Sequence, residues 1–189
     1  LTGQTALITG ASRGIGAATA VRLAECGAAV TLAARSTGEI ETVAAGIRDA
    51  GGTADAVACD VTVYDQVAAA VGHCTTAHGG LHILVNNAGL IEPVSRLADS
   101  DPDEWARVAD VNYKGVYHGL RAAIPVMLAA GGGTIVNISS GAATSALEGW
   151  SHYCSSKAAV LMLTRCADKE YGAEGIRVIG LSPGTVATG

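Results

Sequence analysis

A glycine-rich turn near the start of the chain constrains the fold more than any other stretch. The short, largely apolar run 4–9 is typical of a buried strand, and the Ala-rich segment 17–26, which ends at Gly27, is typical of a helix. Between them lies the sequence TGASRGIG, from Thr9 to Gly16. Glycines let this backbone turn sharply and approach a phosphate closely, and the following helix N-terminus attracts the phosphate charge. A second strand at 29–34 completes a β-α-β unit, so we predict a dinucleotide site here.

The alternation of strand and helix continues along the chain. We predict further strands at 53–59, 81–85, 134–138 and 175–181, and helices at 36–50, 63–78, 99–130 and 149–171. Hydrophobic residues make up 49% of the sequence, with no Phe, and such small aliphatic strands suit a sheet buried on both faces. No linker or repeat interrupts the pattern. We therefore predict one α/β domain over residues 1–189: a doubly wound parallel sheet flanked by helices, with right-handed crossovers.

The composition argues against several classes of function. The net charge is −5, so no basic surface indicates nucleic-acid binding, and no apolar run is long enough to span a membrane. The five histidines show no metal-ligand spacing. The five cysteines are scattered without a Cys-x-x-Cys pair, which predicts reduced thiols in a cytoplasmic protein. We expect no nucleic-acid, membrane or metal partner.

The end of the second strand indicates which dinucleotide would bind. An acidic residue there would bond the ribose hydroxyls of NAD. This chain instead has Ala34 and then Arg35, and Arg13 lies within the glycine turn. Guanidinium groups suit the geometry of a 2′-phosphate. The sequence favours NADP(H) over NAD(H), although NAD(H) stays possible and Arg35 could instead simply open a solvated loop.

Tyr153 and Lys157 are the first candidates for chemistry. They lie four residues apart in the predicted helix 149–171, which places both side chains on one face. The positive charge of Lys157 favours the phenolate form of Tyr153, which helps a phenol exchange a proton near neutral pH. Ser140 follows the strand 134–138 at the end where open α/β sheets bind ligands. A Tyr–Lys pair alone is common on helix surfaces, so it marks a site only if a cofactor and a pocket lie beside it.

Two further polar residues allow more than one interpretation. Asp60, after the third strand, could accept a hydrogen bond from an adenine amino group or cap the next helix, a position for which Thr62 competes. Asn112 lies inside the predicted helix 99–130, where Asn is unfavourable. It indicates a bent helix or a bound water, and an ordinary surface Asn is the alternative.

Together these residues resemble the short-chain dehydrogenase/reductase family. Five motifs occur in the family's order: Thr9–Gly16, Asp60-Val61, Asn86-Asn87-Ala88-Gly89, Ser140 with Tyr153 and Lys157, and Pro183-Gly184. The resemblance implies a Rossmann-like fold and a catalytic set of Asn112, Ser140, Tyr153 and Lys157. Tyr153 would be the general acid/base, Ser140 would hold the substrate oxygen, Lys157 would support Tyr153 and bind the nicotinamide ribose, and Asn112 would hold a relay water. The implied cofactor contacts are Gly10, Ser12, Arg13, Gly14, Ile15, Gly16, Arg35, Asp60, Val61, Asn87, Ala88, Gly89, Tyr153, Lys157, Pro183, Gly184, Val186 and Thr188.

The resemblance also implies an activity. It points to an NADP(H)-dependent oxidoreductase, a carbonyl reductase or alcohol dehydrogenase, with a small carbonyl or alcohol substrate. It implies a homodimer or homotetramer with contacts through the helices 99–130 and 153–171. The alternative is a non-catalytic dinucleotide-binding sensor or regulatory protein on the same fold. An epimerase or lyase fits less well, because the resemblance associates those with a differently spaced glycine turn.

The substrate itself is largely invisible in the sequence. Segments 91–97 and 142–150 would line its pocket, with Glu92 and His152 as polar candidates and Trp150 as a ring face. Family members continue after the Pro-Gly segment with a substrate lid and a last strand. The resemblance therefore implies that both follow Gly189; a protein that ends there is the alternative.

Overall fold

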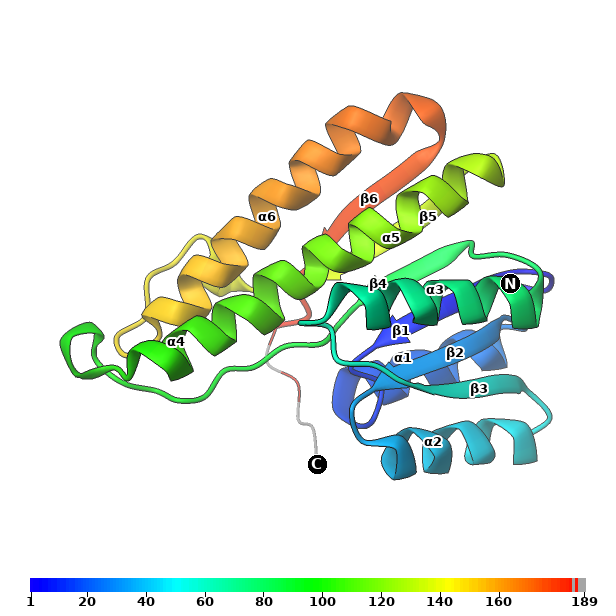
Figure 1. Ribbon diagram of the computed structural model, residues 1–189, viewed down its shortest axis with the longest axis horizontal. Helices are drawn as coiled ribbons and strands as arrows, with labels where there is room; N and C mark the ends of the chain where they lie inside the picture. The colour runs from blue at the N-terminus through cyan, green and yellow to red at the C-terminus, as the bar shows by residue number, and fades with distance from the viewer. Residues whose placement is uncertain (185, 187–189) are drawn as a thin grey trace.

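Six parallel strands form a single sheet in the computed structural model, which describes residues 1–184 and 186 (Figure 1). Their spatial order is β3-β2-β1-β4-β5-β6, which confirms the predicted doubly wound parallel sheet. The strands are β1 (Thr5–Thr9), β2 (Ala29–Ala34), β3 (Thr53–Ala58), β4 (Ile83–Asn86), β5 (Gly133–Ile138) and β6 (Ile176–Leu181).

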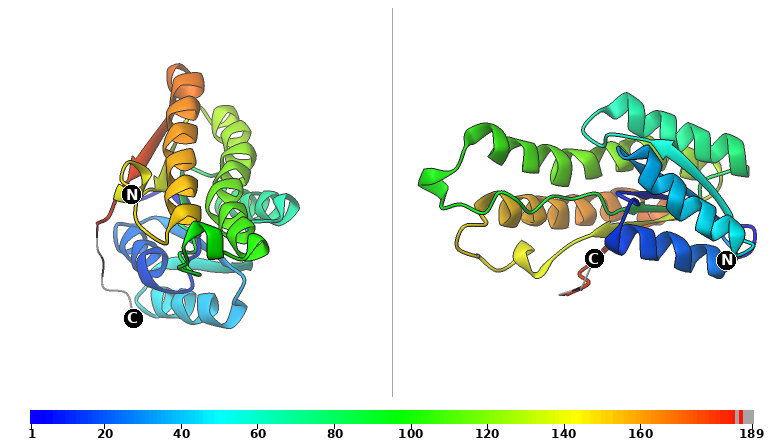
Figure 2. Two further views of the ribbon diagram at one scale, coloured as in Figure 1. Left: turned by 90° about the vertical axis from the view of Figure 1, so that its left-hand side faces the viewer. Right: turned by 90° about the horizontal axis from the view of Figure 1, so that it is seen from below.

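Helices cover both faces of this sheet (Figures 1 and 2). The helices are α1 (Gly14–Glu25), α2 (Thr37–Asp49), α3 (Tyr64–His78), α4 (Pro102–Ala109), α5 (Gly115–Ala129) and α6 (Ser151–Tyr171). Short 3₁₀ turns lie at η1 (Leu97–Asp99), η3 (Gly141–Ala143) and η4 (Gly172–Glu174), and a π turn, η2 (Asp110–Lys114), joins α4 to α5.

The two faces follow from the alternation of side chains along each strand. In β1, Ala6 and Ile8 pack with α1 and α2, whereas Leu7, between them, packs with α3, α5 and α6. All three side chains are fully buried. Full burial of an aliphatic side chain such as Leu7 or Ile8 contributes about 1.5–3 kcal/mol, so a register slip of one residue would be costly. The apolar strands therefore fix the position of each loop that follows them.

The region predicted as one helix over 99–130 is divided. Asp101 caps α4 by accepting from the backbone N–H groups of Asp103 and Glu104, both at 2.9 Å, and Pro102 occupies the first turn. The chain then widens into the π turn before α5 begins at Gly115. The helix is irregular at Asn112, which points inward with no exposed surface. The alternative of a surface Asn is wrong.

The carboxyl ends of all six strands meet at one edge of the sheet, because every neighbouring pair is parallel. The chain reverses direction across the sheet between β1 and β4, and open α/β sheets bind ligands in the crevice at such a switch point. Nearly all the predicted site residues follow a strand at this edge: 10–16 after β1, Arg35 after β2, Asp60 and Val61 after β3, 87–89 after β4, Ser140 after β5, and Pro183, Gly184 and Val186 after β6. Thr188 lies outside the described residues.

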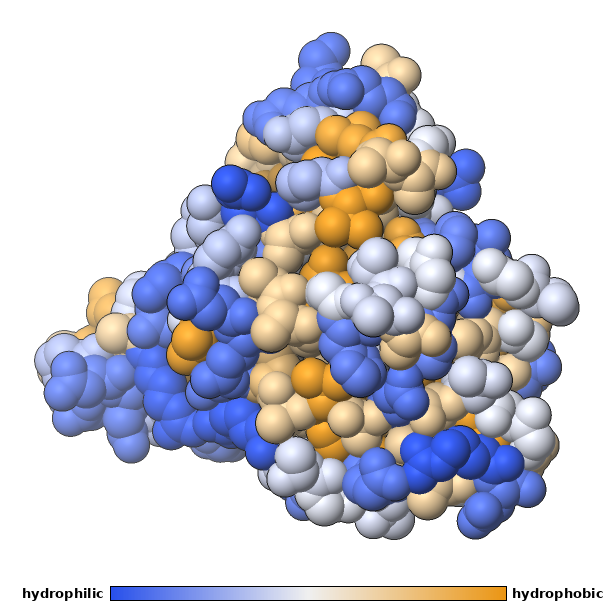
Figure 3. Space-filling view, turned by 45° about the vertical axis from the view of Figure 1, so that its right-hand side comes forward, coloured by the Kyte–Doolittle hydropathy of each residue, from blue (hydrophilic) through white to orange (hydrophobic). Residues whose placement is uncertain are grey.

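The surface carries both polar and apolar regions. Figure 3 shows hydrophilic residues over the margins of one face and apolar residues in a band across its middle. No helix in the described part of the chain is long and apolar enough to cross a membrane. The cysteines are free thiols, of which Cys59 and Cys74 are buried.

Candidate active site

The glycine turn has the backbone that a phosphate cradle needs. Gly10 and Gly14 have φ of +64° and +57°, a region that favours glycine. A Cβ on Gly16 would lie 2.4 Å from the Gly10 carbonyl oxygen, so the turn and α1 can approach this closely only without a side chain. Arg13, at the N-cap of α1, makes no side-chain cap. The N-terminal N–H groups of α1 thus have no side-chain cap, an arrangement that suits the pyrophosphate of a dinucleotide.

Asn87 holds this turn against the end of β4. Its side-chain N–H₂ donates to the carbonyl oxygens of Thr9 and Gly10, both at 3.0 Å. The Thr9 hydroxyl oxygen accepts in return from the backbone N–H groups of Asn87, at 3.1 Å, and Ala88, at 3.3 Å. The side chain of Asn87 therefore shapes the cradle, and its predicted contact with the cofactor stays a prediction.

Positive charge gathers at the edge where the adenosine end of a dinucleotide would lie. Arg13 and Arg35 are both exposed, and neither belongs to an ion pair found in the described residues. Burial acts to raise the pKa of Asp60, but hydrogen bonds from Thr62 and the charges of Arg35 and Arg107 outweigh it and lower the pKa. Asp60 is therefore ionised and lies within the field of Arg35.

The two alternatives for Asp60 can now be compared. One carboxylate oxygen accepts from the Thr62 backbone N–H at 2.9 Å and from its hydroxyl at 2.8 Å. Neither residue caps the next helix, because the N-cap of α3 is Val63 and no side chain caps it. Val61, whose carbonyl oxygen accepts from His118 Nδ1 at 2.8 Å, is fixed beside Asp60. The helix-cap alternative is wrong, and the adenine contact stays a prediction.

Tyr153 and Lys157 lie on one face of α6, as their spacing predicts. The Lys157 ammonium is 5.6 Å from the centroid of the Tyr153 ring and donates to the Ile138 carbonyl oxygen at 2.7 Å. Only 5% of Lys157 is exposed, and Ile138 is the last residue of β5. The Trp150 ring meets the Tyr153 ring edge to face, with centroids 5.5 Å apart. The phenol is thus held between a buried cation and an aromatic wall.

Burial lowers the pKa of Lys157 from 10.5 to about 8. The unfolded chain therefore binds more protons than the folded one between about pH 8 and 10.5, and stability rises with pH in that window. The lowered pKa corresponds to a loss of about 3 kcal/mol in the free energy of unfolding at neutral pH. This loss disappears as the pH rises through the window. In urea denaturation, we expect the free energy of unfolding of wild type, relative to Lys157→Met, to increase by about 2–3 kcal/mol from pH 7.5 to 10.5. The difference between wild type and Lys169→Met, a substitution at an exposed position of α6, should not change with pH. If the free energy of unfolding changed equally with pH in wild type and Lys157→Met, the effect of burial on the pKa would be contradicted.

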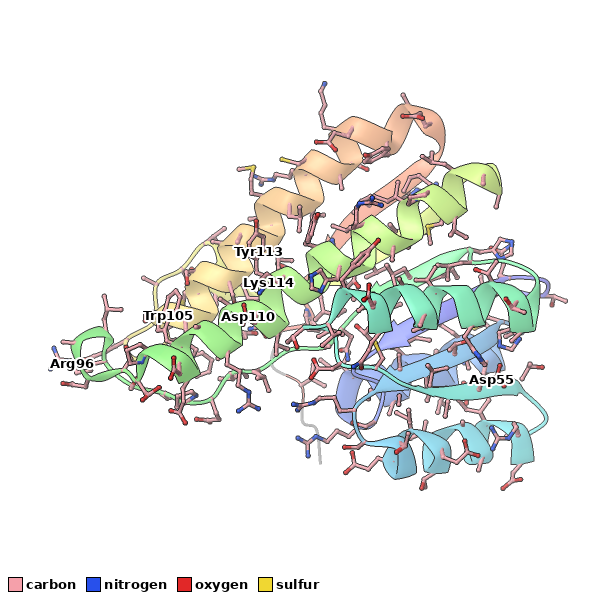
Figure 4. The ribbon with its side chains drawn as sticks, viewed as in Figure 1. Asp55, Arg96, Trp105, Asp110, Tyr113 and Lys114 are labelled. Carbon is pink, nitrogen blue, oxygen red and sulfur yellow. The ribbon has the colours of Figure 1, made fainter. Side chains whose placement is uncertain are left out.

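Asn112 connects the π turn to the loop after β4 and to α6 (Figure 4 labels its neighbours Asp110, Tyr113 and Lys114). Its Oδ1 accepts from the Leu90 N–H at 2.7 Å, and its Nδ2 donates to the Leu90 carbonyl oxygen at 2.8 Å. Nδ2 also donates to the Ser156 hydroxyl at 3.1 Å. Both amide hydrogens are therefore used, and only an Oδ1 lone pair remains for a water.

Gly89 lies beside two of the predicted catalytic side chains. A Cβ there would lie 3.4 Å from Asn112 Oδ1 and 3.9 Å from Lys157 Nζ. Ser140, past the end of β5, uses its hydroxyl oxygen to accept from the Ala142 N–H at 3.2 Å, which leaves its O–H as a donor. Three of the four predicted catalytic side chains thus reach one end of the sheet from α6, the π turn and β5, and Tyr153 shares its helix face with Lys157.

His152, a polar candidate for the substrate pocket, points into the protein instead. It is 2% exposed, and its Nε2 bonds to the Ile91 carbonyl oxygen at 2.6 Å. Ser156, 3% exposed, donates to the Tyr153 carbonyl oxygen at 2.8 Å. The sequence does not single out Ser156, for which a hydroxyl at an otherwise buried helix position is the only signal. Thr9, which begins the predicted glycine-turn motif, organises the cradle through its hydroxyl.

Comparison with known proteins identifies relatives. The chain is 43% identical over 185 residues to the cis-4-hydroxycyclohexanecarboxylate dehydrogenase of Sinomonas cyclohexanicum, covering 98% of this chain and 74% of that enzyme. It is 40% identical over 188 residues to the 3-alpha-(or 20-beta)-hydroxysteroid dehydrogenase of Mycobacterium bovis, covering 100% and 71%.

Solved structures agree. A metagenomic short-chain oxidoreductase in complex with NADP superposes with a TM-score of 0.92 at 41% identity, over 98% of this chain and 84% of that one. An NAD⁺-bound xylitol dehydrogenase superposes with a TM-score of 0.96 at 34% identity, over 100% and 72%. The short chain dehydrogenase family model matches residues 4–189. The chain therefore belongs to the short-chain dehydrogenase/reductase family, and it is an oxidoreductase that acts on the hydroxyl or carbonyl group of its substrate.

Proposed function

We propose that the protein is an NADP(H)-dependent dehydrogenase/reductase for alicyclic secondary alcohols and the corresponding ketones. The observation that carries the proposal is the buried Lys157 ammonium beside the Tyr153 ring, at the same sheet edge as the glycine turn. The bare turn at Gly10 and Gly16 fits a pyrophosphate. When bound, the nicotinamide supplies or accepts the hydride.

The side chains of this chain would handle the proton and the oxygen. Tyr153 gives a proton to the carbonyl oxygen during reduction and takes one from the alcohol during oxidation. The Ser140 O–H donates to the same oxygen and stabilises the negative charge that develops on it. Lys157 stabilises the phenolate through its charge. Asn112 holds Leu90 in place, and a relay water would bond to its remaining Oδ1 lone pair.

The preference for NADP(H) rests on charge. No carboxylate stands at the tip of β2, and Arg35 follows directly, with Arg13 in the neighbouring turn. Two guanidinium groups suit a 2′-phosphate, whereas a ribose diol would prefer a carboxylate there. One solved relative is bound to NADP and another to NAD⁺. The choice of cofactor therefore depends on individual residues such as Arg35 and not on the fold.

The preference for ring substrates rests on the apolar character of the substrate side. Trp150 stands against Tyr153, and Ile91, Val94 and Leu147 are 41%, 48% and 46% exposed on the adjoining loops. These surfaces suit an aliphatic ring. Two relatives are named for a hydroxycyclohexane and for hydroxysteroids.

We also propose that the protein forms a homodimer or homotetramer. Tyr113 in the π turn is 40% exposed, Tyr117 near the start of α5 is 48% exposed, and Met162 on α6 is 56% exposed. Large apolar side chains on two adjacent helices favour contact with a second copy.

The test is a comparison of NADP⁺ and NAD⁺ in wild type and Arg35→Asp, with cyclohexanol and a 3-hydroxysteroid as substrates. We expect wild type to oxidise at least one of these alcohols and to prefer NADP⁺. Arg35→Asp should raise the Kd for NADP⁺ by about 10- to 100-fold, because a charged hydrogen bond to phosphate is replaced by repulsion. The Kd for NAD⁺ should change by less than about threefold. Quenching of Trp105 and Trp150 emission reports both affinities.

The control is Arg22→Asp, which makes the same charge change on α1 at an exposed ion pair with Glu25 and should alter neither Kd. Equal loss of NADP⁺ affinity in both variants would mean that net charge, and not a phosphate contact, sets the preference. Tighter binding of NAD⁺ by wild type would overturn the cofactor assignment. Turnover of acyclic but not cyclic alcohols would overturn the substrate class.

A further inference from the structure

We propose that His152 is a positioning residue, which holds the loop on the substrate side of the active site against the helix that carries Tyr153. The proposal deepens the proposed function and rests on it for the catalytic consequence. His152 lies outside the four predicted catalytic residues, and its side chain is too deeply buried to contact a substrate.

The contact is buried and its direction is fixed. His152 is 2% exposed, and its Nε2 lies 2.6 Å from the Ile91 carbonyl oxygen. A carbonyl oxygen can only accept, so Nε2 carries the hydrogen and the ring is held in that tautomer or as imidazolium. Residues 90–96 have no regular secondary structure. Such a segment keeps its position only through contacts of this kind.

His152 is one of two anchors on consecutive residues of this loop. Asn112 binds both the N–H and the carbonyl oxygen of Leu90, and His152 binds the carbonyl oxygen of Ile91. Asn112 also donates to Ser156, which donates to the Tyr153 carbonyl oxygen. The loop is thus connected to α6 in two ways, through Asn112 in the π turn and directly through His152. Loss of His152 removes the direct connection, which lies next to Tyr153.

The other contacts of this loop lie farther out. The Ser95 N–H donates to the Gly149 carbonyl oxygen at 3.0 Å, and Arg96 lies 3.6 Å from Glu148. Arg96 stands at the tip of the loop (Figure 4), and both charged side chains are more than three-quarters exposed. Exposed ion pairs contribute little, whereas a buried hydrogen bond leaves an unsatisfied carbonyl when its donor is removed. Among the contacts of the loop beyond Leu90, the His152 hydrogen bond is therefore the one whose loss should matter most.

Its loss should act on substrate positioning and not on cofactor affinity. Ile91 and Val94 are among the exposed apolar side chains that we propose contact the substrate. A more mobile loop would therefore bind the substrate less tightly and position it less well for Tyr153. The cradle depends instead on Thr9 and Asn87, which make no hydrogen bond to His152 among the described residues.

The experiment compares His152→Phe, which keeps a ring but no donor, with His152→Gln, which keeps a side-chain N–H. Two readouts are used: hydrogen–deuterium exchange of the amides of residues 90–99 with NADP⁺ bound, and steady-state oxidation of the best alicyclic alcohol. For His152→Phe we expect about tenfold faster exchange in this segment, about tenfold higher KM, and kcat changed by less than about threefold. The Kd for NADP⁺ should stay within about twofold. His152→Gln should restore most of both effects, and His73→Phe, at a histidine whose side chain is 44% exposed on α3, should show neither.

The outcomes separate the two proposals. Unchanged exchange of residues 90–99 in His152→Phe overturns the positioning role, whatever the activity. Faster exchange over the whole chain, with an equal loss in His152→Gln, also overturns it, since that result reports general destabilisation. Faster local exchange that Gln rescues, in a protein whose wild type oxidises no alicyclic alcohol, supports the anchor and rejects the proposed substrate class instead.

Discussion

Replacement of Tyr153 with phenylalanine should lower kcat for alcohol oxidation by about a thousandfold or more, with NADP⁺ affinity unchanged to within about twofold. A positioned general acid/base contributes about 10²- to 10⁴-fold, and the phenol hydroxyl is the only group that this change removes. The substituted ring retains its edge-to-face contact with Trp150 and its place beside the Lys157 ammonium. The cradle at the glycine turn is untouched. The variant should therefore bind the cofactor and fail at the proton transfer.

The measurement pairs initial rates with fluorescence titration of NADP⁺ for Tyr153→Phe and for Tyr113→Phe. Tyr113 is a matched control, because it stands next to Asn112 in the π turn but is 40% exposed. It should keep the wild-type rate. A Tyr153→Phe enzyme with its rate intact would remove the phenol from the mechanism. A wild type that binds NADP⁺ but turns over no alcohol or ketone would favour the dinucleotide sensor.

Much of the fold could be predicted because it follows from local patterns. Buried strands of small aliphatic residues alternate with helices, and the period of that alternation allows only a parallel sheet with crossovers. The positions of Arg35, Asp60 and Ser140 then follow without side-chain detail, since the residue after each parallel strand must stand at the same edge. Tyr153 and Lys157 share a face because of helical spacing alone.

The parts that could not be predicted depend on contacts between segments distant in the sequence. Asn112 marks an irregular point in the predicted helix 99–130, but its partner, Leu90, lies 22 residues earlier and cannot be predicted from the local sequence. His152 stands next to Tyr153, which makes it a candidate for the substrate pocket, yet its ring turns inward to Ile91, 61 residues away. The sequence around Asn87 likewise gives no sign that its side chain binds the carbonyl oxygens of Thr9 and Gly10. Helical spacing determines the face a residue occupies but not its partner.

Gly16→Ala should both destabilise the fold and abolish measurable NADP⁺ binding. An added Cβ would lie 2.4 Å from the Gly10 carbonyl oxygen and 2.5 Å from Asn87 Nδ2, far inside van der Waals contact. The Gly10 carbonyl is backbone and is itself bonded to Asn87, so relief requires α1 to move away from the turn. Overpacking of this kind costs about 1–3 kcal/mol. A displaced α1 no longer presents its N–H groups to the pyrophosphate, so we expect a Kd for NADP⁺ raised by about 100-fold or more.

The matched control is Gly46→Ala, in the interior of α2, where an added Cβ meets no atom within 4 Å. Alanine is the better helix former, so this variant should be more stable than wild type by about 0.5–1 kcal/mol and should bind NADP⁺ as wild type does. Urea denaturation and Trp fluorescence titration measure both quantities for both variants. If Gly16→Ala lost stability but bound NADP⁺ normally, the cofactor would not lie against the glycine turn. If Gly16→Ala kept both wild-type stability and wild-type affinity for NADP⁺, α1 would not approach Gly10 this closely in solution, and the glycine turn would not need to be free of side chains.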